Sequence, residues 1–247
     1  VIALCVLATI TFAYLIQSRL ELNASFEKIM PQSHPYIKNY LQNKDQLRGL
    51  GDSLRIVVEN PKGNVFDAEY LETLRQINDE VFLVSGVDRA WMKSLWMPVV
   101  RWTEVTEEGF TGGPVIPESY DGSVASLSLV GQNVARAGIV GSLVANDYRS
   151  SMIFVPMLSV DASGHRIDYK KLRTHLETIR AKYESEGKVK IYIVGFSKLV
   201  GDLMAGLEKI MLYFLIATLI AGIIIFTYTK CLRSTTLVLF CSFIAVI

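Results

Sequence analysis

The sequence predicts an α+β domain flanked by transmembrane α-helices. Residues 1–16 and 210–229 contain no Asp, Glu, Lys or Arg, whereas residues 17–209 carry almost all of the charge. Charge distributed in this way is typical of a membrane protein. Between the two uncharged runs, two segments read as strand, helix and strand at a spacing of roughly a hundred residues, and they predict the α+β domain.

The uncharged run 210–229 predicts a membrane span, which we place over residues 207–229. Twenty helical residues rise about 30 Å, close to the thickness of the hydrocarbon core of a bilayer. The alternative is a buried helix of a soluble protein, which usually keeps one polar stripe. This run offers only Thr218, Thr227 and two tyrosines before its last residue, so a span is favoured.

Two further apolar runs predict additional spans. Residues 1–16 read as a first transmembrane helix that we expect to be truncated, and a signal-peptide core is the alternative. Residues 234–247 read as the start of a third span, which we expect to continue beyond this chain. The turn "KCLR" at 230–233 carries two positive charges and is expected in the cytoplasm, so residues 17–206 are expected on the opposite side.

Cysteine usage and net charge limit the compartment and the partners. Cys5, Cys231 and Cys241 all lie in or beside the apolar runs, which leaves the large domain without a thiol. A domain that needs no disulfide would suit a bacterial periplasm, with the protein as a multi-pass inner-membrane protein. The net charge of +1 gives no reason to expect a nucleic-acid partner.

The domain is predicted to contain two βαβ units. In the first, the strand "LRIVVE" at 54–59 is followed by a helix that begins near Asp67. In the second, "SMIFVPML" at 151–158 precedes a helix capped by Asp168 and ended by Gly187, and "VKIYIV" at 189–194 returns as a strand buried on both faces. Two such units can pair or form ferredoxin-like lobes.

The segment between the two units predicts a hairpin or protruding arm, a helix and a turn. The arm holds three prolines, a Gly-Gly pair and all three tryptophans, Trp91, Trp96 and Trp102. These tryptophans could form an apolar surface for a lipid-like ligand or a neighbouring subunit, and plain core packing is the alternative. Residues 124–137 are expected to form a helix, and a second hairpin is expected to turn at 146–147.

No catalytic, cofactor or metal site is predicted, and we do not expect an enzyme. His34, His165 and His175 have no carboxylate or cysteine at metal-ligand spacing. The stretch "GFSKLVGD" lacks the Gly-Lys-Ser/Thr of a phosphate loop, and Leu199 stands where a nucleophile elbow needs glycine.

The junction between the domain and the span at 207–229 is the candidate functional site. A predicted strand ends at Gly195, a short connection with Gly201 and Asp202 follows, and a helix is then expected to run into the bilayer. Asp202 is placed to cap that helix. The junction could couple movement of the domain to the span, and a passive tether is the alternative.

The order of these segments resembles the first half of a resistance-nodulation-division (RND) permease. The resemblance rests on "FEKIMPQSHPYIKNY", "ANDYRSSMIFVPML" and "YIVGFSKLVGDL" between two spans and covers essentially the whole chain. Within this family, the chain most resembles the predicted exporters of the MMPL and hopanoid-transporter branch. The matching positions are Gly195, Gly201, Asp202 and the 147–156 hairpin.

The resemblance implies a proton-driven transporter with repeated halves, whose periplasmic domain handles hydrophobic or lipid-like cargo. The acidic proton-relay residues of the family belong to the fourth span of each half, and this chain departs from the family by stopping in the third. The implied partners are the bilayer, the cargo, the rest of the same polypeptide and a homo-oligomer. The alternative function is a membrane-anchored extracytoplasmic sensor, which should follow its last span with a polar signalling helix.

Overall fold

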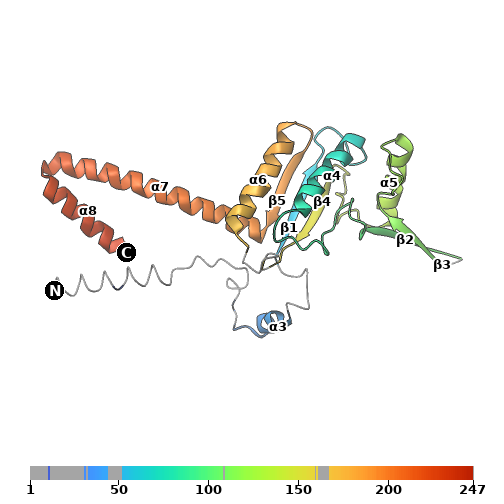
Figure 1. Ribbon diagram of the computed structural model, residues 1–247, viewed down its shortest axis with the longest axis horizontal. Coiled ribbons are helices and arrows are strands. Elements are labelled where there is room, and N and C mark those ends of the chain that lie inside the picture. Colours follow the sequence, from blue (N-terminus) through green and yellow to red (C-terminus); the bar gives the residue numbers. More distant parts are fainter. Residues whose placement is uncertain are drawn as a thin grey trace. The chain divides into compact units, whose positions relative to one another are not determined.

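A computed structural model describes Thr11, Pro31 and residues 33–43, 52–107, 109–158, 160 and 167–246 (Figure 1). Its contacts divide the chain into two units. One lies within Ile29–Leu203 and is called the domain below, and the other includes Met204–Ile247. Each unit is described by itself.

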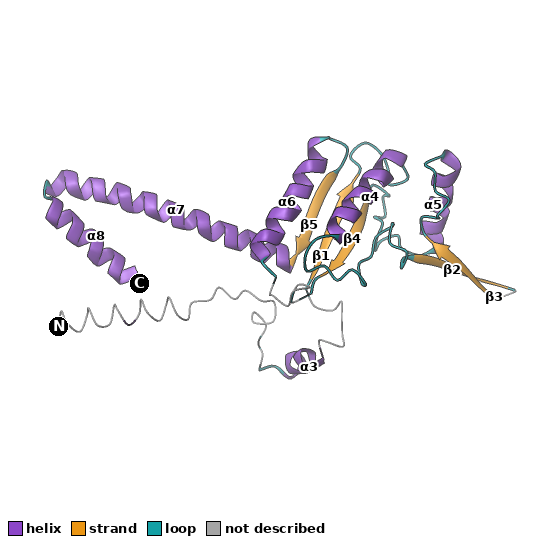
Figure 2. Ribbon diagram, in the orientation of Figure 1, coloured by secondary structure: helices purple, strands orange, loops and turns teal. Residues whose placement is uncertain are grey.

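The centre of the domain is a three-stranded antiparallel sheet with the strand order β4-β1-β5 (Figure 2). Its strands are β1 (Ser53–Glu59), β4 (Ser150–Pro156) and β5 (Lys190–Gly195). Both neighbours run antiparallel to β1, so β4 and β5 run parallel to each other on either side of it. Side chains alternate between the two faces of a strand, and Leu54, Ile56 and Val58 of β1 are buried on the same face.

Two helices cover one face of this sheet, α4 (Ala68–Phe82) and α6 (Tyr169–Ser185) (Figure 1). The Asp67 carboxylate accepts the N–H of Tyr70 at the start of α4. The predicted cap of α6 is confirmed, because Asp168 accepts the N–H groups of Lys170 and Lys171. Gly187 follows the end of α6 with a φ of +66°, as its predicted role requires.

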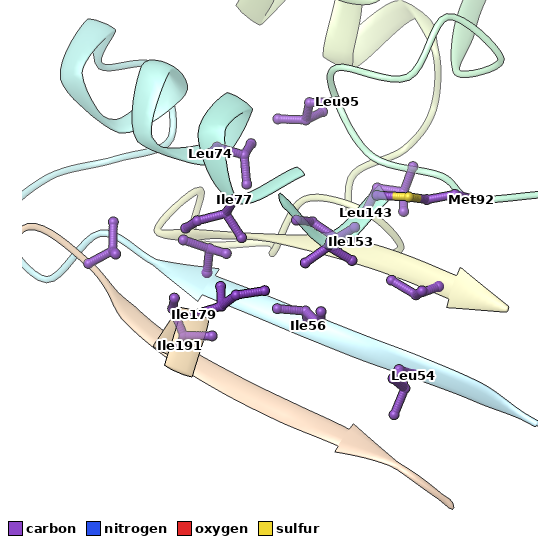
Figure 3. Packing of buried hydrophobic residues seen from close by; sticks show 14 of the residues in the cluster. Leu54, Ile56, Leu74, Ile77, Met92, Leu95, Leu143, Ile153, Ile179 and Ile191 are labelled. Carbon is purple, nitrogen blue, oxygen red and sulfur yellow. The ribbon is translucent and has the colours of Figure 1, made fainter. Parts of the chain in front are cut away.

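The core of the domain lies between the sheet and these helices. Figure 3 shows Leu74 and Ile77 of α4 above Ile56 and Ile153 of the sheet, and all four side chains are fully buried. Burial of each such side chain stabilises the fold by about 1.5–3 kcal/mol. The hydroxyl of Tyr70 lies 2.8 Å from the Val58 carbonyl oxygen and 2.7 Å from the Ser151 hydroxyl, so this buried polar group is satisfied.

Of the two predicted βαβ units, the second forms as β4–α6–β5, with β1 between its strands. After α4 the described residues contain no returning strand. Val87 and Lys93 make only isolated antiparallel bridges, to Met157 and Phe154. Turns between Asp88 and Met97 interrupt the extended backbone and account for the difference.

The prediction that the last strand is buried on both faces is wrong. Tyr192 and Val194 of β5 are exposed, whereas Ile191 is buried. Helices cover only one face of the sheet, and an antiparallel sheet can leave its other face in water.

The segment between the two units forms the predicted arm and helix. β2 (Arg101–Thr106) and β3 (Gly109–Pro114) make an antiparallel hairpin, and α5 (Val124–Arg136) follows. At the predicted second hairpin the chain does turn, with Tyr148 at a φ of +55°, but only an isolated bridge from Val144 to Ser151 forms.

The remaining helices are α3 (Pro35–Asn43), α7 (Phe196–Thr229) and α8 (Leu232–Val246). Within the described residues, α7 alone is long and apolar enough to cross a membrane, and α8 is apolar but shorter. A residue with positive φ, Lys230, separates α7 from α8. A Cβ atom added at Gly222 would lie 3.1 Å from Leu239 Cδ1, so the two helices pack against each other. Apart from Thr11, the predicted first span lies outside the described residues.

Candidate domain–membrane junction

Strand β5 passes into α7 with no loop between them. The strand ends at Gly195 and the helix begins at Phe196. Gly195 has a φ of +156°, and a Cβ atom there would lie 2.5 Å from the carbonyl oxygen of Ser53. No side chain fits so close to the backbone of β1, so this turn requires glycine. The last strand of the sheet is therefore joined directly to the first turn of α7.

Asp52 caps the start of α7 from a distant part of the chain. Its Oδ1 accepts a hydrogen bond of 3.3 Å from the N–H of Ser197, and its Oδ2 accepts one from the Ser197 hydroxyl. Burial raises the pKa of Asp52, and the hydrogen bonds from Ser197 offset part of that rise. The residue before β1 thus satisfies a backbone N–H that the first turn of a helix leaves without a partner.

Lys198 connects the first turn of α7 to α6. Its side chain is only 9% exposed, and its Nζ lies 2.8 Å from Glu177 Oε1 and 2.6 Å from Asp202 Oδ2. A buried ammonium group is strongly unfavourable unless anions surround it, and two carboxylates do so here. Glu177 belongs to α6 and Asp202 to α7, so both helices hold the same charge.

Asp202 makes a second link between the two helices. Its Oδ1 accepts a hydrogen bond of 2.6 Å from Nε of Arg173 on α6. Partial desolvation raises the pKa of Asp202, but the hydrogen bonds and charges of Lys198 and Arg173 outweigh it, and the pKa lies below its usual value. Glu177 in turn contacts Arg180 at 2.5 Å. We call Arg173, Glu177, Arg180, Lys198 and Asp202 the junction network.

Gly201 lets the backbones of α6 and α7 approach closely. A Cβ atom at this position would lie 2.7 Å from the carbonyl oxygen of Tyr169 and 2.7 Å from Cβ of Arg173. Neither of these atoms can move without moving α6. The beginning of α7 is therefore fixed to α6 by close packing as well as by charge.

The three residues predicted from the sequence all lie in this region, in two places. Gly201 and Asp202 face α6, whereas Gly195 lies beside β1. The prediction that Asp202 caps a helix after a short connection is wrong, because α7 begins six residues earlier, at Phe196. The backbone needs no connection there, since the conformation of Gly195 makes the turn and Asp52 supplies the cap.

Sequence reasoning missed Asp52, Ser197, Lys198, Arg173 and Glu177. Two signals were present, because Lys198 and Asp202 are four apart, as are Arg173 and Glu177, and such pairs lie on one face of a helix. No local signal connects Asp52 to Ser197, which is 145 residues later in the chain.

The three tryptophans lie in three different settings. Trp91 is 48% exposed in the turns after α4. Trp96 is half-buried and donates its Nε1–H to the Leu71 carbonyl at 2.9 Å. Trp102 lies on β2 with its ring 5.3 Å from the guanidinium of Arg136. None of the ring contacts among the described residues joins two of these tryptophans.

The junction network pairs opposite charges and fixes the position of the start of α7. Within the described part of the chain, no group of three potential metal ligands lies together. Two kinds of contact join α6 to the start of α7, a buried ion pair and a close backbone approach, and the cap from Asp52 joins the start of α7 to the residue before β1. Comparison of the chain with protein-family models and with curated proteins found no match.

Proposed function

We propose that the chain is the N-terminal part of an RND/MMPL-like transporter of the bacterial inner membrane, which exports hydrophobic or lipid-like molecules by using a proton gradient. In this proposal residues 17–206 form the periplasmic domain that handles cargo. Residues 207–229 are a transmembrane helix, and residues 230–233 face the cytoplasm. The observation that carries the proposal is the direct passage of β5 into a long helix whose later residues are uncharged.

The apolar part of α7 supports a place in the membrane. It extends from Ile210 to Thr229 without a charged side chain, and other described parts of the chain bury none of the residues in its most apolar window. About 20 such residues match the hydrocarbon thickness of a bilayer. Leu239 of α8 approaches Gly222 of α7 closely. Such contacts are common between transmembrane helices, because a small residue allows a neighbouring helix to come close.

The arrangement of the domain supports a ferredoxin-like fold. Lys93 bridges to β4 through two backbone hydrogen bonds with Phe154, of 3.0 and 2.8 Å. If this bridge is the remnant of a fourth strand, the order becomes 87–93, β4, β1, β5, with α4 and α6 on one face. This is the split βαβ arrangement.

The junction network gives the proposal a physical route for coupling. Cargo that moved α6 would also move the first turns of α7, because Lys198 and Asp202 are held by Glu177 and Arg173. A helix is a stiff element that carries such a movement along its axis. The sensor alternative is less well supported, because only two residues separate the end of α7 from Leu232, where α8 begins, and α8 is apolar rather than polar.

Transport by the full-length protein that contains this chain tests the proposal. We expect the protein in proteoliposomes to move a fluorescent hydrophobic probe across the membrane when a pH gradient is applied, and to stop when an uncoupler collapses the gradient. Asp202→Ala is expected to reduce the rate while probe binding persists. Probe movement at the same rate with and without the gradient would contradict proton-driven export. So would a correctly inserted protein that moves no probe.

A further inference from the structure

The β2–β3 hairpin has one covered face and one free face. On the covered face, the guanidinium of Arg136 on α5 lies over the Trp102 ring at 5.3 Å and 3.9 Å from the Glu104 carboxylate. The other face, which we call the hairpin face, consists of three cross-strand pairs: Arg101 with Pro114, Thr103 with Gly112, and Val105 with Phe110.

The apolar pair at the end of the hairpin face, Val105 and Phe110, is open to water, and we call it the knob. Val105 is 74% exposed and Phe110 is 83% exposed, and the strand register places them directly opposite each other. A two-stranded hairpin is only marginally stable in water when it stands without further packing. An exposed aromatic and branched pair on such a hairpin indicates a surface that another molecule covers.

A groove of about 780 Å³ lies at the base of the same hairpin. Its apolar wall includes Trp96 and Tyr120, whose rings meet edge to face at 5.7 Å, together with Leu95, Ile116 and three prolines. We call this the aromatic groove. Its rim contains Arg101 and Pro114, the residues at the base of the hairpin face. The knob, the rest of the hairpin face and the aromatic groove therefore form one continuous surface.

The knob of one chain cannot enter its own groove. Val105 lies four positions after Arg101 on an extended strand, a distance of about 13 Å along a hairpin that does not fold back on itself. A second copy placed antiparallel on the hairpin face would bring each knob over the other copy's groove. The middle pair, Thr103 and Gly112, is small, and Gly112 cannot be enlarged, because a Cβ atom there would lie 2.6 Å from the Trp102 carbonyl oxygen.

Charge also favours a second copy. Arg101 at the groove rim and Glu107 beside the knob have opposite charges, and no described residue pairs with either. The other groove charges are mostly engaged, since Glu72 pairs with Arg75 and Asp121 accepts the N–H of Ser123. Glu118 is the one remaining groove charge without a described partner. A two-fold arrangement would form the Arg101–Glu107 pair twice.

We propose that two copies of this chain form a two-fold symmetric dimer through the hairpin face, with Val105 and Phe110 of each copy in the aromatic groove of the other and Glu107 paired to Arg101. Such an interface is self-complementary, and cyclic two-fold dimers are the commonest form of homo-oligomer. The proposal does not depend on transport, because every measurement below reads association alone.

Copurification of two differently tagged copies of the full-length protein from membranes tests the contact. We expect Phe110→Ser to lower copurification by about tenfold or more, as loss of a central aromatic anchor does at interfaces. Leu83→Ser is the matched control, since Leu83 is 72% exposed at the end of α4, away from the hairpin, and its change should have no effect. Equal copurification of wild type and Phe110→Ser would overturn the proposal, and so would a wild type that does not copurify.

A charge exchange tests the pairing without relying on a disruptive change. Glu107→Arg and Arg101→Glu should each weaken copurification, because each places like charges together. The double variant should recover to within about twofold of wild type. A double variant as weak as the sum of the two single changes would show that these residues do not meet.

A disulfide at the symmetry axis tests the geometry. In a chain whose natural cysteines are replaced by serine, Thr103→Cys should oxidise to a covalent dimer in membranes, because residues near a two-fold axis lie close to their own copies. Leu83→Cys is the control and should remain monomeric. Failure of Thr103→Cys to crosslink while copurification is intact would refute the antiparallel arrangement.

Discussion

The domain and the later part of α7 place the same apolar side chains in opposite surroundings. Leu54 in β1 is fully buried, whereas Leu219 in α7 is 57% exposed. In the domain, helices and sheet remove leucine and isoleucine from water, and each burial stabilises the fold by about 1.5–3 kcal/mol. None of the apolar residues in this part of α7 is buried by described protein, and in the proposed function the bilayer supplies the cover.

The junction between the two regions shows how the change of surroundings is arranged along one helix. Ser197, Lys198 and Val200 are buried in the domain, and the last charged side chain of α7 is Lys209. Within about four turns, the helix passes from contacts with the domain to a run without charged side chains. The comparison predicts that changes before and after this boundary have different consequences.

The largest effect is expected from shortening a core leucine. Leu74→Ala should lower the free energy of unfolding of the domain by about 3 kcal/mol, because it removes buried atoms and leaves a cavity. Leu219→Ala, the same change in α7, should leave domain unfolding unchanged. Pulse proteolysis of both variants in membranes measures the difference, and equal losses would remove the distinction between the two regions.

A charge in the apolar part of α7 should disrupt insertion. Leu219→Lys should raise the free energy of membrane insertion by about 3 kcal/mol. Leu199→Lys is the matched control, since Leu199 is also exposed but lies in the domain. A glycosylation reporter measures insertion. The same topology and yield for Leu219→Lys and wild type would contradict a span at this position.

Enlarging Gly201 should separate α7 from α6. Gly201→Val should destabilise the junction by about 2 kcal/mol, because the added atoms collide with the backbone of Tyr169. Gly206→Val is the matched control in the same helix, where a Cβ atom meets nothing within 4 Å. Protease sensitivity near residue 200 should rise in the first variant only. A similar rise in protease sensitivity in both variants would show that the change in helix propensity, and not the collision with α6, causes the effect.

Removal of the Asp202 carboxylate should have a smaller, pH-dependent effect. Asp202→Asn should cost about 1 kcal/mol near pH 7, after allowance for solvent screening of a half-exposed group. The folded pKa of Asp202 is lowered, so its contribution is present above the unfolded pKa of about 3.9 and is lost as pH falls through the folded value. A difference between variant and wild type that grew on acidification would contradict this linkage.

The smallest effect is expected for Asp52→Asn. The folded pKa of Asp52 is raised, so the folded protein binds the proton more tightly and wild type gains stability as pH falls through that value. Asparagine keeps an oxygen for the Ser197 N–H and has no charge to desolvate. The variant should therefore equal or exceed wild type near pH 7, whereas Asp52→Ala should lose about 1 kcal/mol with the cap. Unfolding followed from pH 4 to 7 separates these outcomes.

The parts of the fold that follow from local patterns could be predicted. Hydrophobic periodicity gave α4 and α6, and local capping chemistry placed Asp168 and Gly187 correctly. Exposure of β5 could not be read from its apolar sequence, because it depends on which face of the sheet the helices cover.

The junction shows the same limit. Glycine at 195 and 201 marked places where the backbone is crowded, but only the fold reveals what crowds it. Lys198 and Asp202 could have been paired by their spacing had α7 been extended back to Phe196. The cap from Asp52 arises from the placement of β1 beside β5 and has no counterpart in the nearby sequence.

The side of the membrane reached by each end of α7 tests the central claim most directly. In a chain with Cys5 and Cys241 replaced by serine, Ser185→Cys reports on the domain and Cys231 reports on the turn after α7. We expect a membrane-impermeant maleimide to label Ser185→Cys in intact spheroplasts, and Cys231 only after permeabilisation. Labelling of both positions from the same side would show that α7 does not cross the membrane.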